Sequence, residues 1–207
     1  PELSDRAVAL KPSLTLEISA KAKALRDSGK DICSLSAGEP DFATPAFIVE
    51  AAQHALGSGF TRYGPAAGDP DLRAALAHKL SVENGIPTQP DQVLVTNGGK
   101  QAIYNLFQVL LNPGDEVLVP APYWLSYPEM AALAGASTRI IPTKAEEGFR
   151  LDLDLLEQQI TPRSRLLVIN SPGNPSGQVM SRAEMEALAA LVARHPQLMV
   201  MSDEIYE

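Results

Sequence analysis

Residues 166–175 read LLVINSPGNP, and this stretch decides the fold. Its first four residues form a short apolar run, which is typical of a strand buried on both faces. The next six are rich in Asn, Ser, Gly and Pro, which favour a loop. An apolar strand that ends in a polar loop is the expected unit of an open α/β sheet, which binds its ligand at the carboxyl ends of its strands.

The same pattern recurs on both sides of this stretch. Apolar runs predict further strands at residues 93–95, 116–119, 138–141 and 198–201. Amphipathic spacing predicts helices at residues 101–111, 127–134, 152–160 and 181–192, the last opened by the capping box Ser181-Arg182-Ala183-Glu184. Because short strands alternate with helices, we expect an α/β fold, with a mainly parallel sheet and helices on both of its faces.

The amino-terminal part of the chain is less regular. We expect an irregular arm up to Ser13, which caps a helix that ends at Gly29, and then a strand-like run at residues 31–35. Helical patterns follow at about residues 46–56 and 70–83, separated by a stretch rich in Gly and Pro.

Composition narrows the possible partners and the location. The 207 residues carry a formal net charge of -8, and an acidic chain repels phosphate backbones and anionic lipid, so we expect neither nucleic acid nor a membrane as partner. No apolar run approaches membrane-spanning length, and the first residues lack the apolar core of a signal peptide. The one cysteine, Cys33, lies in an apolar run where we expect a buried thiol, and a cytoplasmic setting fits best.

Four polar segments each follow a predicted strand. They are Asn97-Gly98-Gly99-Lys100, Pro122-Tyr123-Trp124, Asn170-Ser171-Pro172-Gly173-Asn174-Pro175 and Ser202-Asp203-Glu204-Ile205-Tyr206. Taken singly, each has an ordinary explanation, such as a turn, a core aromatic or a helix cap. Their joint occurrence at strand ends favours a single site.

The four segments supply what an aromatic phosphate cofactor needs. Residues 98–100 open a helix, whose free amides and dipole favour a phosphate, and Trp124 offers a flat apolar face for a ring. Asn174 can hydrogen-bond a ring hydroxyl, and Asp203 can pair with a protonated ring nitrogen and raise the pKa of that nitrogen. A pyridinium held in this way is the electron sink of pyridoxal chemistry. We expect no metal site.

These segments resemble those of the class I aminotransferases, the fold-type-I pyridoxal-phosphate enzymes, and are most similar to the bacterial aspartate aminotransferase subgroup, which includes prephenate-using enzymes. The likeness runs through essentially all 207 residues. Other segments that carry it are Lys11-Pro12-Ser13, Ala37-Gly38-Glu39-Pro40-Asp41-Phe42, Tyr63-Gly64-Pro65-Ala66-Ala67-Gly68, Tyr123-Trp124-Leu125-Ser126-Tyr127-Pro128 and Asn174-Pro175-Ser176-Gly177. The resemblance implies that residues 1–45 are the arm, helix and strand of a small domain, and that residues 46–207 begin the large cofactor-binding domain.

The resemblance also implies pyridoxal 5'-phosphate as cofactor and a role for each matching position. For the cofactor, Gly98, Gly99 and Lys100 would hold the phosphate, Trp124 would stack on the ring, Asn174 and Tyr206 would bind the ring hydroxyl, and Asp203 would pair with the ring nitrogen. Tyr63 would reach the cofactor phosphate of a neighbouring subunit in a homodimer. The substrate would be contacted by Gly38, Lys100, Trp124 and Asn174. Asp203, Tyr206 and Trp124 would be the catalytic residues of this chain. Pro122 and Pro175 match positions that are often cis.

Lys100 bears on the substrate. The resemblance associates this lysine with the distal carboxylate of acidic substrates, and a solvated or phosphate-facing lysine is the alternative. The implied reaction moves an amino group between an amino acid, aspartate or glutamate, and a 2-oxo acid in a ping-pong cycle. Alternatives of the same fold are an aromatic or prephenate aminotransferase and a β-lyase, and alternatives of another class are a sensor and an inactive cofactor-binding fragment.

The lysine that forms a Schiff base with the cofactor follows the Asp-x-x-Tyr segment by several dozen residues in this family. The sequence ends at Glu207, one residue after Tyr206, and its last lysine, Lys144, precedes Asn174. We therefore expect the 207 residues alone to fold poorly and to be inactive.

Overall fold

The computed structural model describes residues 2–10, 14–35, 38 and 40–207. The chain forms two units, residues 1–11 together with 97–207, and residues 12–96, and we describe each by itself. The predicted cap Ser13, the rest of the segment Lys11-Pro12-Ser13, and Ala37 and Glu39 lie outside the described residues. The predicted domain boundary after residue 45 stays a prediction.

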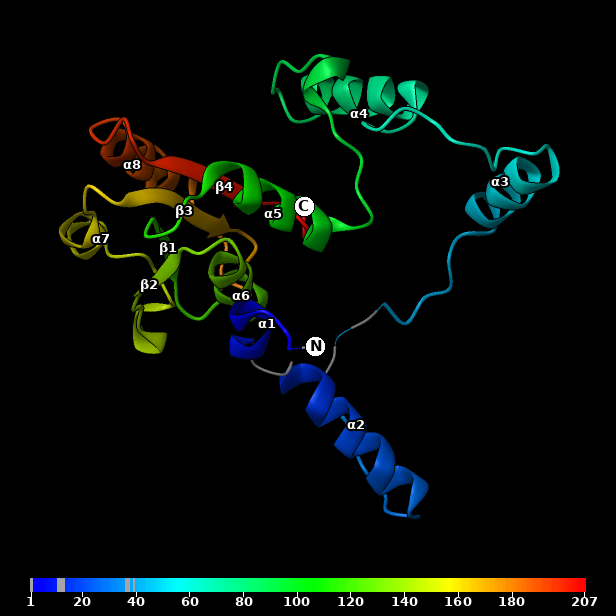
Figure 1. The fold of residues 1–207 in the computed structure, drawn as a ribbon, viewed down its shortest axis with the longest axis horizontal. Coiled ribbons are helices and arrows are strands. Elements are labelled where there is room, and N and C mark those ends of the chain that lie inside the picture. Colours follow the sequence, from blue (N-terminus) through cyan, green and yellow to red (C-terminus); the bar gives the residue numbers. More distant parts are fainter. Residues whose placement is uncertain (1, 11–13, 36–37, 39) are drawn as a thin grey trace. The chain divides into compact units, whose positions relative to one another are not determined.

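A four-stranded parallel sheet organises the unit that contains the carboxyl terminus. Its strands are β1 (Glu116–Pro120), β2 (Ser137–Ile141), β3 (Ser164–Asn170) and β4 (Met199–Asp203), in the order β2-β1-β3-β4 (Figure 1). The pairing of β1 with β3 has one irregularity, between Glu116 and Val117. The predicted α/β class and the parallel sheet are confirmed.

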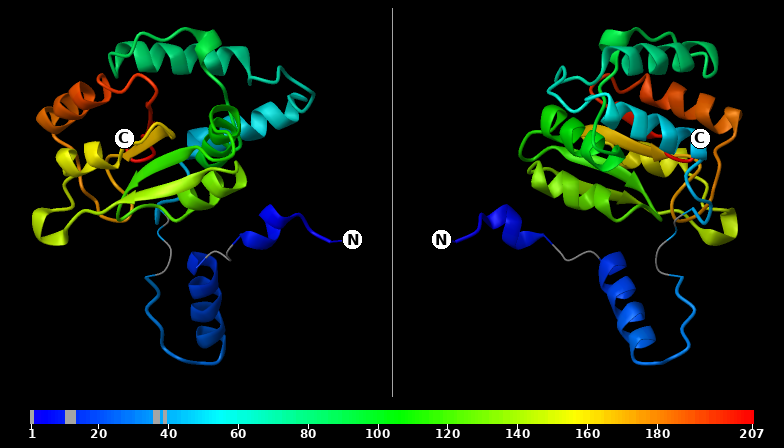
Figure 2. Two further views of the ribbon diagram at one scale, coloured as in Figure 1. Left: turned by 60° about the vertical axis from the view of Figure 1, so that its left-hand side comes forward. Right: turned by 90° about the vertical axis from the view of Figure 1, so that its right-hand side faces the viewer.

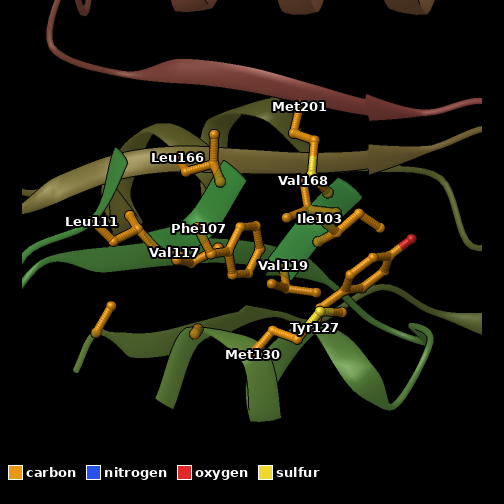
Figure 3. Close-up of a cluster of buried hydrophobic side chains, with 12 residues drawn as sticks. Ile103, Phe107, Leu111, Val117, Val119, Tyr127, Met130, Leu166, Val168 and Met201 are labelled. Atoms are coloured by element: carbon orange, nitrogen blue, oxygen red, sulfur yellow. The ribbon is translucent and has the colours of Figure 1, made fainter. Parts of the chain in front are cut away.

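Helices cover both faces of this sheet, as the alternation of strands and helices predicts (Figure 2). Helices α5 (Gly99–Leu110) and α6 (Ser126–Leu133) pack on one face, where Phe107 and Tyr127 are almost fully buried (Figure 3). Helices α7 (Leu153–Gln159) and α8 (Arg182–Val192) pack on the other face. Each face therefore removes a continuous apolar layer from water, which is the main favourable term in folding.

Local capping signals in this unit behave as predicted, with one addition. The Ser181 hydroxyl accepts from the Glu184 amide and the Glu184 carboxylate accepts from the Ser181 amide, so the predicted capping box opens α8. The arm is not irregular throughout, because Ser4 caps a short helix α1 (Asp5–Ala9). Arg6 of this helix donates to the carbonyl of Leu133 at 3.5 Å. The 3₁₀ turn η2 (Ala145–Glu147) belongs to this unit, and the 3₁₀ turn η1 (Pro90–Gln92) belongs to the other unit.

The other unit contains α2 (Leu14–Asp27), α3 (Ala46–Gly57) and α4 (Pro70–Val82). Gly29, with φ of 83°, follows α2 as predicted, since glycine tolerates this left-handed conformation.

Three predictions for this unit are wrong, namely two strands and the burial of Cys33. Residues 31–35 and 93–95 are not strands, because within the described parts of the chain no neighbouring strand pairs with them. Val95 bonds instead to the carbonyl of Ala67 at 2.9 Å. Cys33 is exposed rather than buried, since its run forms no sheet that a second layer could cover. Within the described ranges, no helix combines the length and the hydropathy that crossing a bilayer demands.

A buried carboxylate at the amino end of β1 joins this strand to β2 and to the segment that precedes β3. Glu116 is only 3% exposed, and its oxygens accept from Arg139 at 3.0 Å and Arg163 at 2.9 Å. Thr161 donates to the same carboxylate at 2.7 Å. The Arg139 hydrogen bond, together with the Thr161 hydrogen bond and the positive charges of Arg139 and Arg163, outweighs burial and lowers the pKa of Glu116 to about 2.

Glu116→Gln should therefore destabilise the protein at neutral pH by about 2 kcal/mol, because two arginines lose their charged partner. A depressed pKa stabilises the fold above the ordinary value of 4.5, and this contribution is lost as the pH falls from about 4.5 to about 2. Urea unfolding at several pH values measures the difference between the two proteins, which should shrink across that window. Glu186→Gln, which breaks the surface pair with Arg182, is the control and should change little. An equal loss at every pH would contradict the assignment.

Candidate functional site

A cleft of about 260 Å³ opens at the carboxyl ends of β3 and β4, beside the amino end of α5. Six of the residues predicted for the site line it together: Gly99, Lys100, Trp124, Asn174, Asp203 and Tyr206. Four more lining residues, Ile103, Tyr127, Asn170 and Ile205, had no predicted role. This edge of the sheet is where an open α/β fold binds ligands.

The carboxylate of Asp203, the last residue of β4, is held by two neutral donors. The Tyr127 hydroxyl donates to Oδ2 at 2.6 Å, and the amide of Ile205 donates to Oδ1 at 3.3 Å. Burial of Tyr127, followed by its hydrogen bond to Asp203, raises the pKa of this phenol well above its ordinary value. Tyr127 therefore remains a protonated donor at any working pH.

Trp124 lies between Tyr127 and Lys100. Its ring meets that of Tyr127 edge to face, with centroids 5.3 Å apart and planes at 83°. The Nζ atom of Lys100 lies over the indole, 5.0 Å from its centroid. A cation–π contact at an exposed site contributes about 0.5–1 kcal/mol, so a ligand carrying a negative charge can readily displace or recruit this amine.

Asn170 connects the ends of β3 and β4, and sequence reasoning assigned it no role. Its Nδ2 donates to the carbonyl of Asp203 at 2.8 Å, while its Oδ1 accepts from the amide of Asn174 at 2.8 Å. Asn174 in turn donates through Nδ2 to the Tyr206 hydroxyl at 3.1 Å. A polar residue that ends the apolar run of β3 was the available signal for Asn170.

The amino end of α5 offers backbone donors to the cleft. Gly98 precedes the helix with φ of 81°, a conformation that favours glycine. The amides of Gly99 and Lys100 belong to the first turn, where a helix provides them with no internal acceptor. A Cβ built on Gly99 would meet nothing within 4 Å, which leaves open space for an approaching anion.

The peptide bonds before Pro122 and Pro175 are cis, as expected, and the bond between Ser171 and Pro172 is also cis, which the sequence did not indicate. Tyr63 and Gly38 are exposed residues of the other unit, so their expected roles stay predictions. Among the described residues, no group of three or more His, Cys, Asp or Glu side chains is placed to hold a metal ion.

A parallel sheet whose carboxyl edge combines a helix amino end, an aromatic face and an anionic strand end defines an α/β domain that binds a phosphorylated aromatic cofactor. The comparisons with known proteins narrow this class. The family model "Aminotransferase class I and II" matches residues 30–207, and the chain belongs to this family.

The relatives agree with the family model. A bifunctional aspartate aminotransferase and glutamate/aspartate-prephenate aminotransferase of Petunia hybrida is 54% identical over 99% of this chain and 43% of its own length. The aspartate/prephenate aminotransferase of Thermus thermophilus is 52% identical over 99% of this chain and 53% of its own length. A structure of the Thermus thermophilus aspartate aminotransferase with maleate superposes with a TM-score of 0.96 at 51% identity, over 100% of this chain and 54% of that one. The chain thus spans about half the length of the curated relatives it matches.

The cofactor of this family is pyridoxal 5'-phosphate, and the residues of the cleft fit it. Asp203 supplies an anion that no cationic side chain neutralises among the described residues. Trp124 supplies an aromatic face, and the open space beside Gly99 faces the free amides that a phosphate requires.

Asn170→Asp should weaken cofactor binding about 10-fold, because the new carboxylate cannot donate to the Asp203 carbonyl and lies close to a second negative charge. Titration of the cofactor-free protein with pyridoxal 5'-phosphate, followed by absorbance, measures the dissociation constant. Gln108→Glu adds the same charge on an exposed position of α5 and should leave the constant unchanged. Equal affinities for the two variants would show that Asn170 does not organise the site.

Proposed function

We propose that the protein is a pyridoxal-phosphate-dependent aminotransferase that moves an amino group between aspartate or glutamate and a 2-oxo acid. The observation that carries the proposal is the carboxylate of Asp203, which stands at a strand end in the cleft, bonded only to neutral donors among the described residues. A carboxylate that is bonded only to neutral donors can form an ion pair with a cationic nitrogen of a bound ring. Family membership supports the same chemistry.

In this proposal the chain's own residues hold each part of the cofactor. Asp203 keeps a proton on the ring nitrogen, Trp124 packs on the ring, and the amides of residues 99–100 bind the phosphate. Asn174 and Tyr206 are bonded to one another at 3.1 Å, and each would use a further hydrogen-bonding position to bind the ring hydroxyl. When bound, the cofactor supplies a ring that accepts electrons from the substrate.

The position of the Lys100 amine supports the proposal that the substrate is an acidic amino acid. Its amine lies over Trp124 in the cleft, where it can pair with a carboxylate on the far end of an amino acid. The Petunia and Thermus relatives carry both aspartate and prephenate in their names. Prephenate has two carboxylates, so it is our second candidate, as an amino-group acceptor that uses the same lysine.

We further propose that the reaction needs groups besides those of the described cleft. Of the described residues that line it, Lys100 is the one lysine, while Lys144 pairs with Glu147 at 2.7 Å outside it. We expect the lysine that holds the cofactor covalently in this family to be neither Lys100 nor Lys144, and without it we expect residues 1–207 to be inactive. We also propose a cytoplasmic homodimer in which Tyr63 serves the neighbouring subunit's cofactor phosphate.

Asp203→Ala should lower the affinity for pyridoxal 5'-phosphate roughly 10- to 100-fold, because a charge-assisted hydrogen bond is lost. Quenching of Trp124 fluorescence during cofactor titration measures this, with Trp124→Phe protein as the blank. In protein that also contains the lysine that holds the cofactor, aspartate aminotransferase activity at saturating cofactor should fall severely, since a ring without its proton accepts electrons poorly. Asp154→Ala, an exposed change on α7, is the control. Near-normal binding and turnover in Asp203→Ala would refute the proposed function.

In protein that also contains the lysine that holds the cofactor, Lys100→Gln should reduce kcat/KM for aspartate by about 10-fold or more. It should leave kcat/KM for phenylalanine within about 3-fold, because only aspartate has a distal carboxylate. Half-reaction assays with aspartate, glutamate, prephenate and phenylalanine rank the substrates. Lys144→Gln, which removes an exposed lysine and its surface pair, is the matched control. If Lys100→Gln lowered all four values equally, Lys100 would serve the cofactor phosphate and not the substrate.

A further inference from the structure

Tyr127 touches both groups that the proposed function places against the cofactor ring, although it was assigned no role of its own. Its hydroxyl donates to Asp203 at 2.6 Å, and its ring meets Trp124 edge to face at 5.3 Å. The side chain is only 2% exposed. One buried residue thus contacts the anion on β4 and the aromatic residue that precedes α6.

We propose that Tyr127 is a positioning residue that orients the Asp203 carboxylate and the Trp124 ring together for the cofactor ring. This inference rests on the proposed function, because the role of Tyr127 depends on the roles proposed for Asp203 and Trp124. Tyr127 does not touch the reacting atoms in this assignment. It acts through Asp203 and Trp124.

The position of Tyr127 makes it rigid. Figure 3 shows its ring in the apolar cluster beside Val119 and Met130, with the hydroxyl oxygen directed away from the cluster. Val119 belongs to β1 and Met130 to α6, so the ring is fixed by the strand and the helix that form the core. Packing at this density leaves a buried ring few alternative rotamers.

The Asp203 carboxylate needs such an anchor. It lies at the last residue of a strand, and its other donor among the described residues, the Ile205 amide, is 3.3 Å away in the segment that follows β4. A hydrogen bond of 2.6 Å from a core residue fixes the direction of the carboxylate far better than a long bond from a loop. Asn170 secures the backbone of Asp203, and Tyr127 secures its side chain.

The hydroxyl group orients Asp203 and the ring orients Trp124, so Tyr127→Phe tests the contact with Asp203 by itself. Phenylalanine keeps the ring in the core and beside Trp124, and it removes the donor to Asp203. We expect pyridoxal 5'-phosphate to bind about 10-fold more weakly, as loss of a hydrogen bond to a charged group implies. We also expect a smaller induced circular dichroism per bound cofactor, because the ring is held less firmly.

A double-mutant cycle separates this role from a merely structural one. Cofactor dissociation constants are measured for the purified wild-type protein, Tyr127→Phe, Asp203→Ala and the double variant. In the Asp203→Ala background the hydroxyl has no partner to orient, so adding Tyr127→Phe should change the constant by less than about 2-fold. Tyr104→Phe, which removes a phenol from a more exposed position on α5, should match the wild type.

The outcomes are distinct. Loss of affinity in Tyr127→Phe that disappears in the Asp203→Ala background supports the inference. The same loss in both backgrounds, or wild-type affinity and induced circular dichroism in Tyr127→Phe, overturns it. Thermal unfolding of the cofactor-free proteins shows whether Tyr127→Phe still folds, and an unfolded variant would overturn the claim that the hydroxyl acts on the Asp203 carboxylate rather than on folding. Unchanged cofactor affinity in Asp203→Ala overturns the proposed function, whereas an impaired Asp203→Ala beside a normal Tyr127→Phe overturns only this inference.

Discussion

The parallel register of β3 and β4, which places Asn170 opposite Asp203, is the constraint on which the site depends. Because the two strands end at the same level, the Asn170 amide reaches the Asp203 carbonyl at 2.8 Å and still accepts from Asn174 at 2.8 Å. A shift of one residue would turn every side chain of a strand to the other face of the sheet. The buried layers on both faces forbid that shift, so the core fixes the geometry of the cleft.

Much of this arrangement could be predicted from the sequence, where the controlling interactions are local. The capping box at Ser181 and the four paired strands depend on residues within a few positions or on an apolar run, and they were found. The runs at residues 31–35 and 93–95 have the same apolar character, yet they are not strands. A strand requires a neighbour as well as a suitable sequence, and the neighbour is not encoded locally.

The site shows the same limit. Asn174, Asp203 and Tyr206 could be predicted because each lies in a polar segment after an apolar strand, and the family resemblance gave them roles. Tyr127 and Asn170 act through hydrogen bonds to Asp203, from 76 and 33 residues away in the chain. Tyr127 looks like the first apolar residue of an ordinary helix, and nothing in that pattern indicates that its hydroxyl meets a carboxylate on another element.

The carboxylates at the two ends of the sheet have opposite kinds of hydrogen-bond partner. This contrast explains how the fold leaves the Asp203 carboxylate available to a cationic ligand. At the amino end, Glu116 is paired with Arg139 and Arg163. Its charge therefore holds β1 to β2 and to the segment that precedes β3. At the carboxyl end, Asp203 receives only a phenol and an amide among the described residues. Neutral donors stabilise the anion without cancelling its charge, whereas an arginine would compete with any cation that arrived in the cleft. An orienting tyrosine is therefore the better partner for a carboxylate that must remain available to a ligand.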